Sequence, residues 1–169
     1  IFATPYQLAP AACNEYARRQ IISFCEFLPD SYFAAKAPYQ WGGHVSTTDT
    51  ARWTAEYWCK ALVGKRAEFA GDAATQQMTR KFGVLALNGR GYESNVAELQ
   101  RVVKERCNID VVALMTGNAT PDQMNAAIVK ARSEGVTTIM PMVMFYDVLL
   151  GGSAAQAQGY FPEWWVNDF

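Results

Sequence analysis

The sequence predicts an α/β fold built on doubly wound, mostly parallel sheets. The first reason is a regular spacing, because strand-like segments begin about every 27 residues, at Phe82, Ile109, Val136 and Phe161. Helical stretches fill the gaps, and such an interval suits a strand-and-helix unit that joins parallel strands. The second reason is that the first of these segments, residues 82–87, is apolar without alternation, as expected when helices cover both faces of a sheet.

The first of these strands and its helix are the most regular. Residues 82–87 read Phe-Gly-Val-Leu-Ala-Leu, which predicts a central, buried strand. The segment from Glu93 to Arg106 follows, with apolar residues at helical spacing at Val96, Leu99, Val102 and Val103. We expect a helix with one buried stripe.

The next unit has a clear helix start. Ile109 to Met115 repeats the strand pattern, and Thr120 then provides a hydroxyl for the N-cap, with a proline after it and Gln123 at the third helical position. Gly135 suits the left-handed residue that ends a helix.

The last two units are shorter. Val136 to Met142 is predicted as a strand, Asp147 to Gln158 as a helix and Phe161 to Val166 as a closing strand. In that closing strand Trp164 and Trp165 are expected to point to opposite faces. Parallel strands joined by helices take right-handed crossovers, which favours the doubly wound arrangement.

The first half of the chain is less regular. We expect a helix over Ala11 to Arg19, a strand over Ile21 to Phe27 and a helix over Thr48 to Val63. Leu28 to Gly43 is predicted to be irregular, with a possible short strand at Tyr39 to Gly42. A sheet of so few strands leaves its core open, so we expect further chain to complete it.

Composition excludes several classes of protein. The 15 Lys and Arg residues nearly balance the 16 Asp and Glu residues, so no basic face for nucleic acid is expected. The longest apolar stretch, from Val136 to Phe145, is too short for the roughly 20 residues that cross a bilayer. The chain begins at Ile1 without Met or a leader pattern, and we expect that the start of a longer protein is missing.

The four cysteines do not form a metal motif. Cys13, Cys25, Cys59 and Cys107 contain no CxxC pair, and His44 is the single histidine, so no metal or other cofactor is expected. Four cysteines allow two disulfides with three connectivities, which the sequence does not rank, or several buried free thiols. His44, in a turn-like segment, is expected to be an exposed loop residue.

Several short motifs resemble a known family over nearly the whole chain. They are Tyr39-Gln-Trp-Gly42, Leu62-Val-Gly-Lys-Arg-Ala67, Ala70-Gly-Asp72, Arg80-Lys-Phe-Gly-Val84, Tyr92 after its strand, and Gly159-Tyr-Phe-Pro-Glu-Trp164. Their order and spacing resemble the type I solute-binding proteins of ABC importers, of the branched-chain amino-acid receptor kind. The resemblance implies two α/β lobes that hold a solute between them.

The lobes are predicted to meet near a polar stretch, Gly71 to Thr79, which has no strong apolar period. By resemblance, residues 1–79 are the later part of the first lobe, which is incomplete, and residues 80–169 are most of the second lobe. The partners implied are a small amino-acid-like or related polar solute and an ABC permease. The location implied is the periplasm or the outer cell surface.

Ligand-binding residues are expected in the loops beyond the carboxyl ends of the strands. The resemblance places Tyr92 against the solute and Asp147 against an ammonium group, with Tyr146 beside it, and Arg90 could meet a carboxylate. Each has an alternative: Tyr92 packs within its own lobe, Asp147 caps a helix, and Arg90 is a solvated loop residue.

Two other functions use similar architectures. Gly89-Arg-Gly91 hints at a phosphate loop, but Ser94 replaces the third glycine and no acidic residue ends the second strand, which disfavours a nucleotide- or flavin-binding enzyme. No Gly-x-Ser-x-Gly elbow is present, so no catalytic residue is assigned. A ligand-sensing receptor domain of the same fold remains the main alternative, because fold does not fix function.

Overall fold

The protein has two compact units, each built on its own parallel sheet. The structure, a computed structural model, describes residues 2–3, 10–25, 28–43, 45–88, 92–142 and 145–166. The first unit runs to Trp53 and the second begins at Thr54. Both sheets are parallel and connected through helices, which confirms the predicted fold class.

The first unit has a three-stranded sheet in the order β1-β2-β3. Its elements are β1 (Phe2–Ala3), α1 (Pro10–Arg18), β2 (Ile22–Cys25), α2 (Asp30–Lys36), β3 (Gln40–Gly42) and the start of α3 (Thr47–Tyr57). Along β2, Ser23 and Cys25 are buried while Ile22 and Phe24 are exposed. Cys13 of α1 and Phe33 of α2 pack around Cys25, so both helices cover the same face of the sheet. On the other face, Ile22 and Phe24 are 39% and 38% exposed.

The second unit has a four-stranded sheet in the order β5-β4-β6-β7. Its elements are the π-helical turn Trp58–Leu62, α4 (Ala73–Gln76), β4 (Phe82–Leu87), α5 (Tyr92–Cys107), β5 (Val112–Thr116), α6 (Pro121–Ser133), β6 (Thr138–Met142), α7 (Phe145–Ala157) and β7 (Glu163–Trp164). From β4 the chain moves outward to β5 and then returns past β4 to β6, so the winding direction reverses between β4 and β6.

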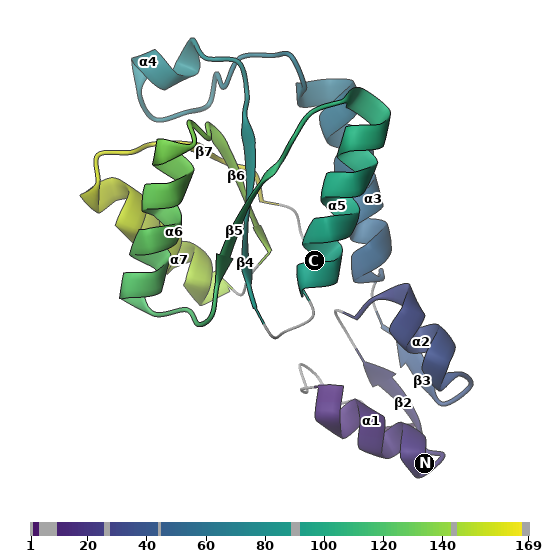
Figure 1. Ribbon diagram of the computed structural model, residues 1–169. Coiled ribbons are helices and arrows are strands. Elements are labelled where there is room, and N and C mark those ends of the chain that lie inside the picture. Colours follow the sequence, from purple (N-terminus) through teal and green to yellow (C-terminus); the bar gives the residue numbers. More distant parts are fainter. Residues whose placement is uncertain are drawn as a thin grey trace. The chain divides into compact units, whose positions relative to one another are not determined.

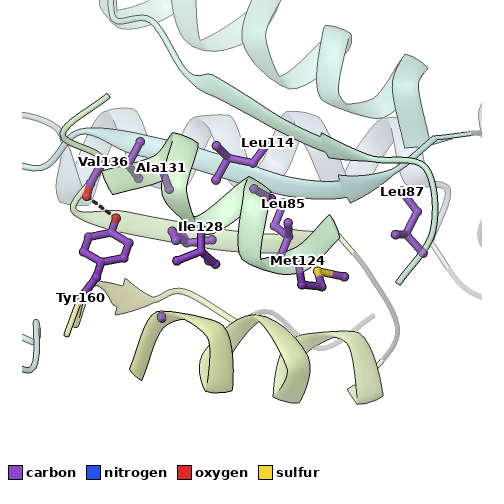
Figure 2. Packing of buried hydrophobic residues seen from close by; sticks show 11 residues of the cluster. Leu85, Leu87, Leu114, Met124, Ile128, Ala131, Val136 and Tyr160 are labelled. Carbon is purple, nitrogen blue, oxygen red and sulfur yellow. Dashed lines mark hydrogen bonds between the residues drawn. The ribbon is translucent and has the colours of Figure 1, made fainter. Parts of the chain in front are cut away.

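Helices cover both faces of this second sheet (Figure 1). Helices α6 and α7 pack side by side on one face, and α5 covers the other with the π-helical turn. All six residues of β4 are buried, as the apolar run predicted. Figure 2 shows how Leu85 and Leu114 meet Met124 and Ile128 of α6 in one continuous core.

Local sequence signals account for the helix ends of this unit. The Thr120 hydroxyl accepts a hydrogen bond from the Gln123 N–H and begins α6, and Pro121 occupies the first helical position. Gly135 has φ +68°, the left-handed conformation that glycine adopts without strain. Both predictions for this helix are confirmed.

A buried ion pair joins the segment before β4 to β7. The Arg80 guanidinium donates two hydrogen bonds of 2.8 Å to the Glu163 carboxylate, which also accepts from the Thr138 hydroxyl and the Phe69 N–H. Burial alone would raise the pKa of Glu163, but the bonds from Arg80, Thr138 and Phe69 outweigh it and lower that pKa. The pair is therefore charged and well hydrogen-bonded.

Two disulfides settle the pairing that the sequence left open. Cys13 of α1 bonds Cys25 of β2 in the first unit, and Cys59 bonds Cys107 at the end of α5 in the second. Each disulfide lies within one unit, so each constrains a local loop. The alternative of buried free thiols is wrong.

Four details of the predicted elements differ in the structure. Helix α2 forms inside the segment 28–43 that was expected to be irregular, and the polar stretch 71–79 contains the short helix α4, capped by the Asp72 side chain. The helix expected over 48–63 ends as a π-helical turn after Tyr57. The closing strand pairs with β6 over two residues only, since Phe161 and Pro162 precede its ladder. The assignment of residues 1–79 and 80–169 to two lobes stays a prediction.

Candidate functional site

The carboxyl ends of three neighbouring strands in the second unit share one edge. β4 ends at Leu87, β5 at Thr116 and β6 at Met142. All three run parallel, with Leu87 opposite Thr116 and Ala86 opposite Met142. The carboxyl ends of these three strands therefore lie together, as the predicted parallel arrangement implies.

The geometry of this edge suits a binding crevice between β4 and β6. Helix α5 leaves β4 over one face and α7 leaves β6 over the other (Figure 1). Where neighbouring connections depart to opposite faces, a crevice opens beyond the strand ends, and open α/β sheets bind their ligands there. The N-termini of α5 and α7 also bring the positive ends of two helix dipoles to this edge.

Tyr92 lies at the place predicted for it. It is the first residue of α5 and is half-buried, with its side chain against the core formed by residues such as Leu87 and Met124. Tyr92 therefore packs against the core of its own unit, as the alternative interpretation predicted. Tyr92 is nevertheless only half-buried, so part of its phenol stays accessible at the carboxyl edge of the sheet.

Asp147 is a buried acidic residue at the same edge. It lies in the first turn of α7, with 8% of its surface exposed. The helix begins at Phe145, so Asp147 is the third helical residue, and the alternative of an N-cap is wrong. A negative charge in the first turn interacts favourably with the helix dipole.

Of the remaining predicted residues, Tyr146 is the second residue of α7, next to Asp147. Arg90 and His44 lie outside the described residues, as do Gly89 and Gly91. Tyr92 and Asp147 thus begin helices at the same edge of the sheet, and their contact with a ligand stays a prediction.

The two tryptophans of the closing segment lie on opposite faces, as predicted. Trp164 packs against the core beneath α6 and α7. Trp165 packs edge-on to Trp58, with ring centroids 5.7 Å apart, and Trp58 stacks on Phe82. Both have packing roles.

Two buried polar side chains near this edge were not predicted from the sequence. Thr116 ends β5 and is 5% exposed, and Asn95 lies in the first turns of α5 and is 4% exposed. A polar residue at the end of an apolar strand is the signal that could have identified Thr116. Asn95 has no such signal, because its burial depends on how α5 lies against the sheet.

No group of three His, Cys, Asp or Glu side chains among the described residues is close enough to hold a metal ion. None of the described helices is both long and apolar enough to cross a bilayer.

Solved structures of other proteins share this architecture. No protein-family model matches the sequence, and no curated protein does. A solved structure described as an ABC transporter permease from the Pseudomonas fluorescens group matches with a TM-score of 0.67 and 13% identity, over 94% of this chain and 37% of that one.

Two further structures carry ligand information in their descriptions. A possible leucine/isoleucine/valine-binding protein from Rhodopirellula baltica matches with a TM-score of 0.65 and 8% identity, over 96% of this chain and 41% of that one. A carbohydrate transporter from Acidothermus cellulolyticus in complex with myo-inositol matches with a TM-score of 0.60 and 12% identity, over 100% of this chain and 54% of that one.

These likenesses concern the fold. The identities of 8–13% are too low to carry function, and the chain spans 37–54% of the length of these structures. The parallel sheets, the strand order β5-β4-β6-β7 and the structural matches agree. The chain therefore has the fold of the type I periplasmic solute-binding proteins, the fold that its sequence motifs resemble.

Proposed function

We propose that this protein is the solute-binding component of an ABC importer and that it binds a small polar solute without catalysing a reaction. The observation that carries this proposal is the shared edge of β4 and β6, where a buried carboxylate and a half-buried tyrosine begin two helices. These groups suit reversible binding, since no nucleophile-and-base pair is assigned at this edge.

An amino-acid-like solute fits these two side chains best. The Asp147 carboxylate would pair with the ligand's ammonium group, and the Tyr92 ring would pack against its carbon chain. A solute without the ammonium would lack this charge-assisted pairing, which gives selectivity. Tyr146 and Arg90 are proposed as further contacts, Arg90 for a carboxylate.

A polyol or sugar is the competing solute class. One structural neighbour binds myo-inositol, while another is described as a branched-chain amino-acid binder. A polyol would use Asp147 as a hydrogen-bond acceptor rather than as an ion-pair partner. The two classes therefore differ in how they respond when Asp147 becomes a neutral amide.

The disulfides support a place outside the cytoplasm. Cys13–Cys25 and Cys59–Cys107 both require an oxidising compartment to persist. A permease partner then follows from the proposed function, with the solute shifting an equilibrium between open and closed arrangements of two lobes. A sensor domain of the same fold would use the same binding step without a permease.

Titration calorimetry with a panel of amino acids, amides, carboxylates and polyols tests the proposal. Tyr92→Ala and Asp147→Ala should each weaken binding by about 1 to 3 kcal/mol without unfolding the protein. Asp122→Ala is the matched control, because Asp122 also lies in the first turn of a helix but is exposed. Unchanged affinity in both site variants would remove this edge from the binding site.

The Asp147→Asn variant separates the solute classes. An amino acid should lose most of its affinity, because the charged partner of its ammonium is gone. A polyol should keep most of its affinity, because an amide still donates and accepts hydrogen bonds. Retained affinity for an amino acid in Asp147→Asn would refute the ammonium pairing.

A further inference from the structure

A disulfide joins two helix ends in the second unit. Cys59 lies in the π-helical turn Trp58–Leu62, which follows α3, and Cys107 is the last residue of α5. Both cysteines are half-buried. Cys13 and Cys25 of the first unit are each 1% exposed, so the two disulfides differ in how accessible they are to a reagent in solution.

The turn that carries Cys59 has an uncommon backbone form. A hydrogen bond of 2.9 Å runs from the Val63 N–H to the Trp58 carbonyl, five residues earlier, where an α-helix would bond four residues earlier. Such π-helical turns are rare, and they occur frequently at functional sites. A rare backbone form of this kind depends on the contacts that surround it.

The side chain of Trp58 adds an unfavourable feature to the same turn. Trp58 is 0% exposed and stacks on Phe82 with ring centroids 4.4 Å apart, but its indole N–H has no hydrogen-bond partner among the described residues. A buried donor without a partner costs free energy, because it has lost its hydrogen bond to water. The turn thus combines a rare backbone form with an unpaired donor.

An ion pair beside the disulfide also joins α5 to the end of α3. The Arg106 guanidinium lies 3.5 Å from the Glu56 carboxylate, and the two side chains are 49% and 40% exposed. Exposed ion pairs contribute little to stability. The disulfide is covalent and joins residues 48 positions apart, so it is the stronger of these two links.

We propose that the Cys59–Cys107 disulfide is a redox-sensitive clamp that holds the π-helical turn in place. A dithiol opens it: one thiolate of the dithiol attacks a sulfur of the disulfide and displaces the other as a thiolate, and the second thiol of the dithiol then releases the attacked sulfur. The protein gains two thiols and the dithiol becomes a disulfide, with two electrons transferred. Once released, the turn exchanges its amide protons faster. This clamp does not depend on the proposed function.

Graded reduction with dithiothreitol tests the order in which the disulfides open, at concentrations that leave the amides of β2 protected from exchange. Alkylation of the new thiols, followed by peptide mass spectrometry, should show the Cys59–Cys107 bond opening about ten-fold faster than Cys13–Cys25. The reason is that a sealed disulfide reacts only after local unfolding. Equal rates, or earlier opening of Cys13–Cys25, would overturn the proposal.

Hydrogen exchange on the partly reduced protein tests the release of the turn. The Val63 amide should exchange about ten-fold faster once the clamp is open, and the Trp58 indole N–H, followed by NMR, should also exchange faster. The amides of β4 should stay protected, because every residue of that strand is buried. Unchanged exchange at Val63 would show that packing alone holds the turn, which contradicts the proposal.

Substitutions separate the clamp from other effects of the reductant. Cys59→Ala combined with Cys107→Ala should reproduce the faster Val63 exchange without any dithiol, and if this variant does not fold, graded reduction of the native protein still decides. Arg106→Gln is the matched control, because it removes only the exposed ion pair, and it should change Val63 exchange by less than about two-fold. An equal effect of Arg106→Gln would assign the link to the ion pair and overturn the proposal.

Discussion

The two sheets of this protein are built alike but are buried very differently. In the second unit every residue of β4 is buried, with helices on both faces. In the first unit the residues of β2 alternate, and Ile22 and Phe24 are exposed together with Trp41 of β3. Among the described residues, the second sheet is thus packed on two faces, whereas the first has its buried side chains on one face and partly exposed ones on the other.

The difference shows what each unit relies on for stability. A small core excludes little apolar surface from water, and small domains often add disulfides in compensation. The first unit's buried cluster is Cys13, Cys25 and Leu28, with Tyr32 and Phe33 at its margin, so a disulfide lies at its centre. In the second unit the disulfide Cys59–Cys107 lies outside the large core beneath α6 and α7.

Glu163→Gln should cause the largest loss of stability, and it affects the second unit. The change leaves the Arg80 guanidinium buried with a neutral partner, and breaking such a pair costs about 3 to 5 kcal/mol. Denaturant unfolding followed by tryptophan fluorescence measures it. A control at an exposed pair, Glu105→Gln beside Arg101, should cost less than about 1 kcal/mol. Equal losses would contradict the importance assigned to the buried network.

Removing the disulfide of the first unit should cause the second-largest loss of stability. Cys13→Ser combined with Cys25→Ser should destabilise that unit by about 3 kcal/mol, because both cysteines belong to its described core cluster and their bond restricts the unfolded chain. Hydrogen exchange should show lost protection in β2 and α1, with β4 still protected. The matched pair, Cys59→Ser with Cys107→Ser, should leave the β4 amides protected. Lost protection in β4 for the matched pair would contradict the comparison.

The buried Glu163 should also make the second unit sensitive to acid. Its pKa is lowered in the folded protein, so the folded state binds fewer protons than the unfolded state. The stabilisation is fully present above the ordinary carboxyl pKa of 4.5 and is lost as the pH falls below it. Unfolding midpoints measured from neutral to acid pH should fall more steeply in the native protein than in Glu163→Gln. Parallel curves would refute the assignment.

Loss of a single buried hydrogen bond should destabilise the protein less than the changes above. The Tyr160 hydroxyl donates to the Val136 carbonyl, and burial raises the pKa of Tyr160 (Figure 2). Tyr160→Phe keeps the ring and leaves that carbonyl unpaired, at a cost of about 1 to 2 kcal/mol. Chemical denaturation measures the change. An unchanged unfolding free energy would show that water replaces the hydroxyl.

A substitution on the partly exposed face of the first sheet should give the smallest loss of stability. Phe24 is 38% exposed, so Phe24→Ala should change the unfolding free energy by about 0.5 kcal/mol or less. Leu85→Ala, at a fully buried position of β4, should cost about 2 to 5 kcal/mol. A large loss in Phe24→Ala would mean that this face is covered in solution.

The parts of the fold that the sequence predicted are those with local signals. The apolar run of β4 and the capping residues Thr120 and Gly135 depend on neighbours in the chain, so their patterns can be interpreted directly. Helix α2 was missed because none of its residues is buried, which leaves no apolar stripe to detect.

Contacts between residues far apart in the chain could not be predicted from the sequence. Arg80 and Glu163 are 83 positions apart, and no local pattern pairs them. The disulfide pairing likewise depends on which helices pack together. The candidate site was placed by the rule that parallel strands share a carboxyl edge, but the burial of Asp147 and Thr116 required the packed structure.

The proposed function places the solute beyond the carboxyl ends of β4 and β6. Backbone amide shifts, mapped while the solute found by calorimetry is titrated, locate the binding site residue by residue. The largest shifts are expected at Asn88, Tyr92 and Asp147. Shifts concentrated instead at the opposite edge of the sheet, around Asp72, Gly135 and Gly159, would contradict it.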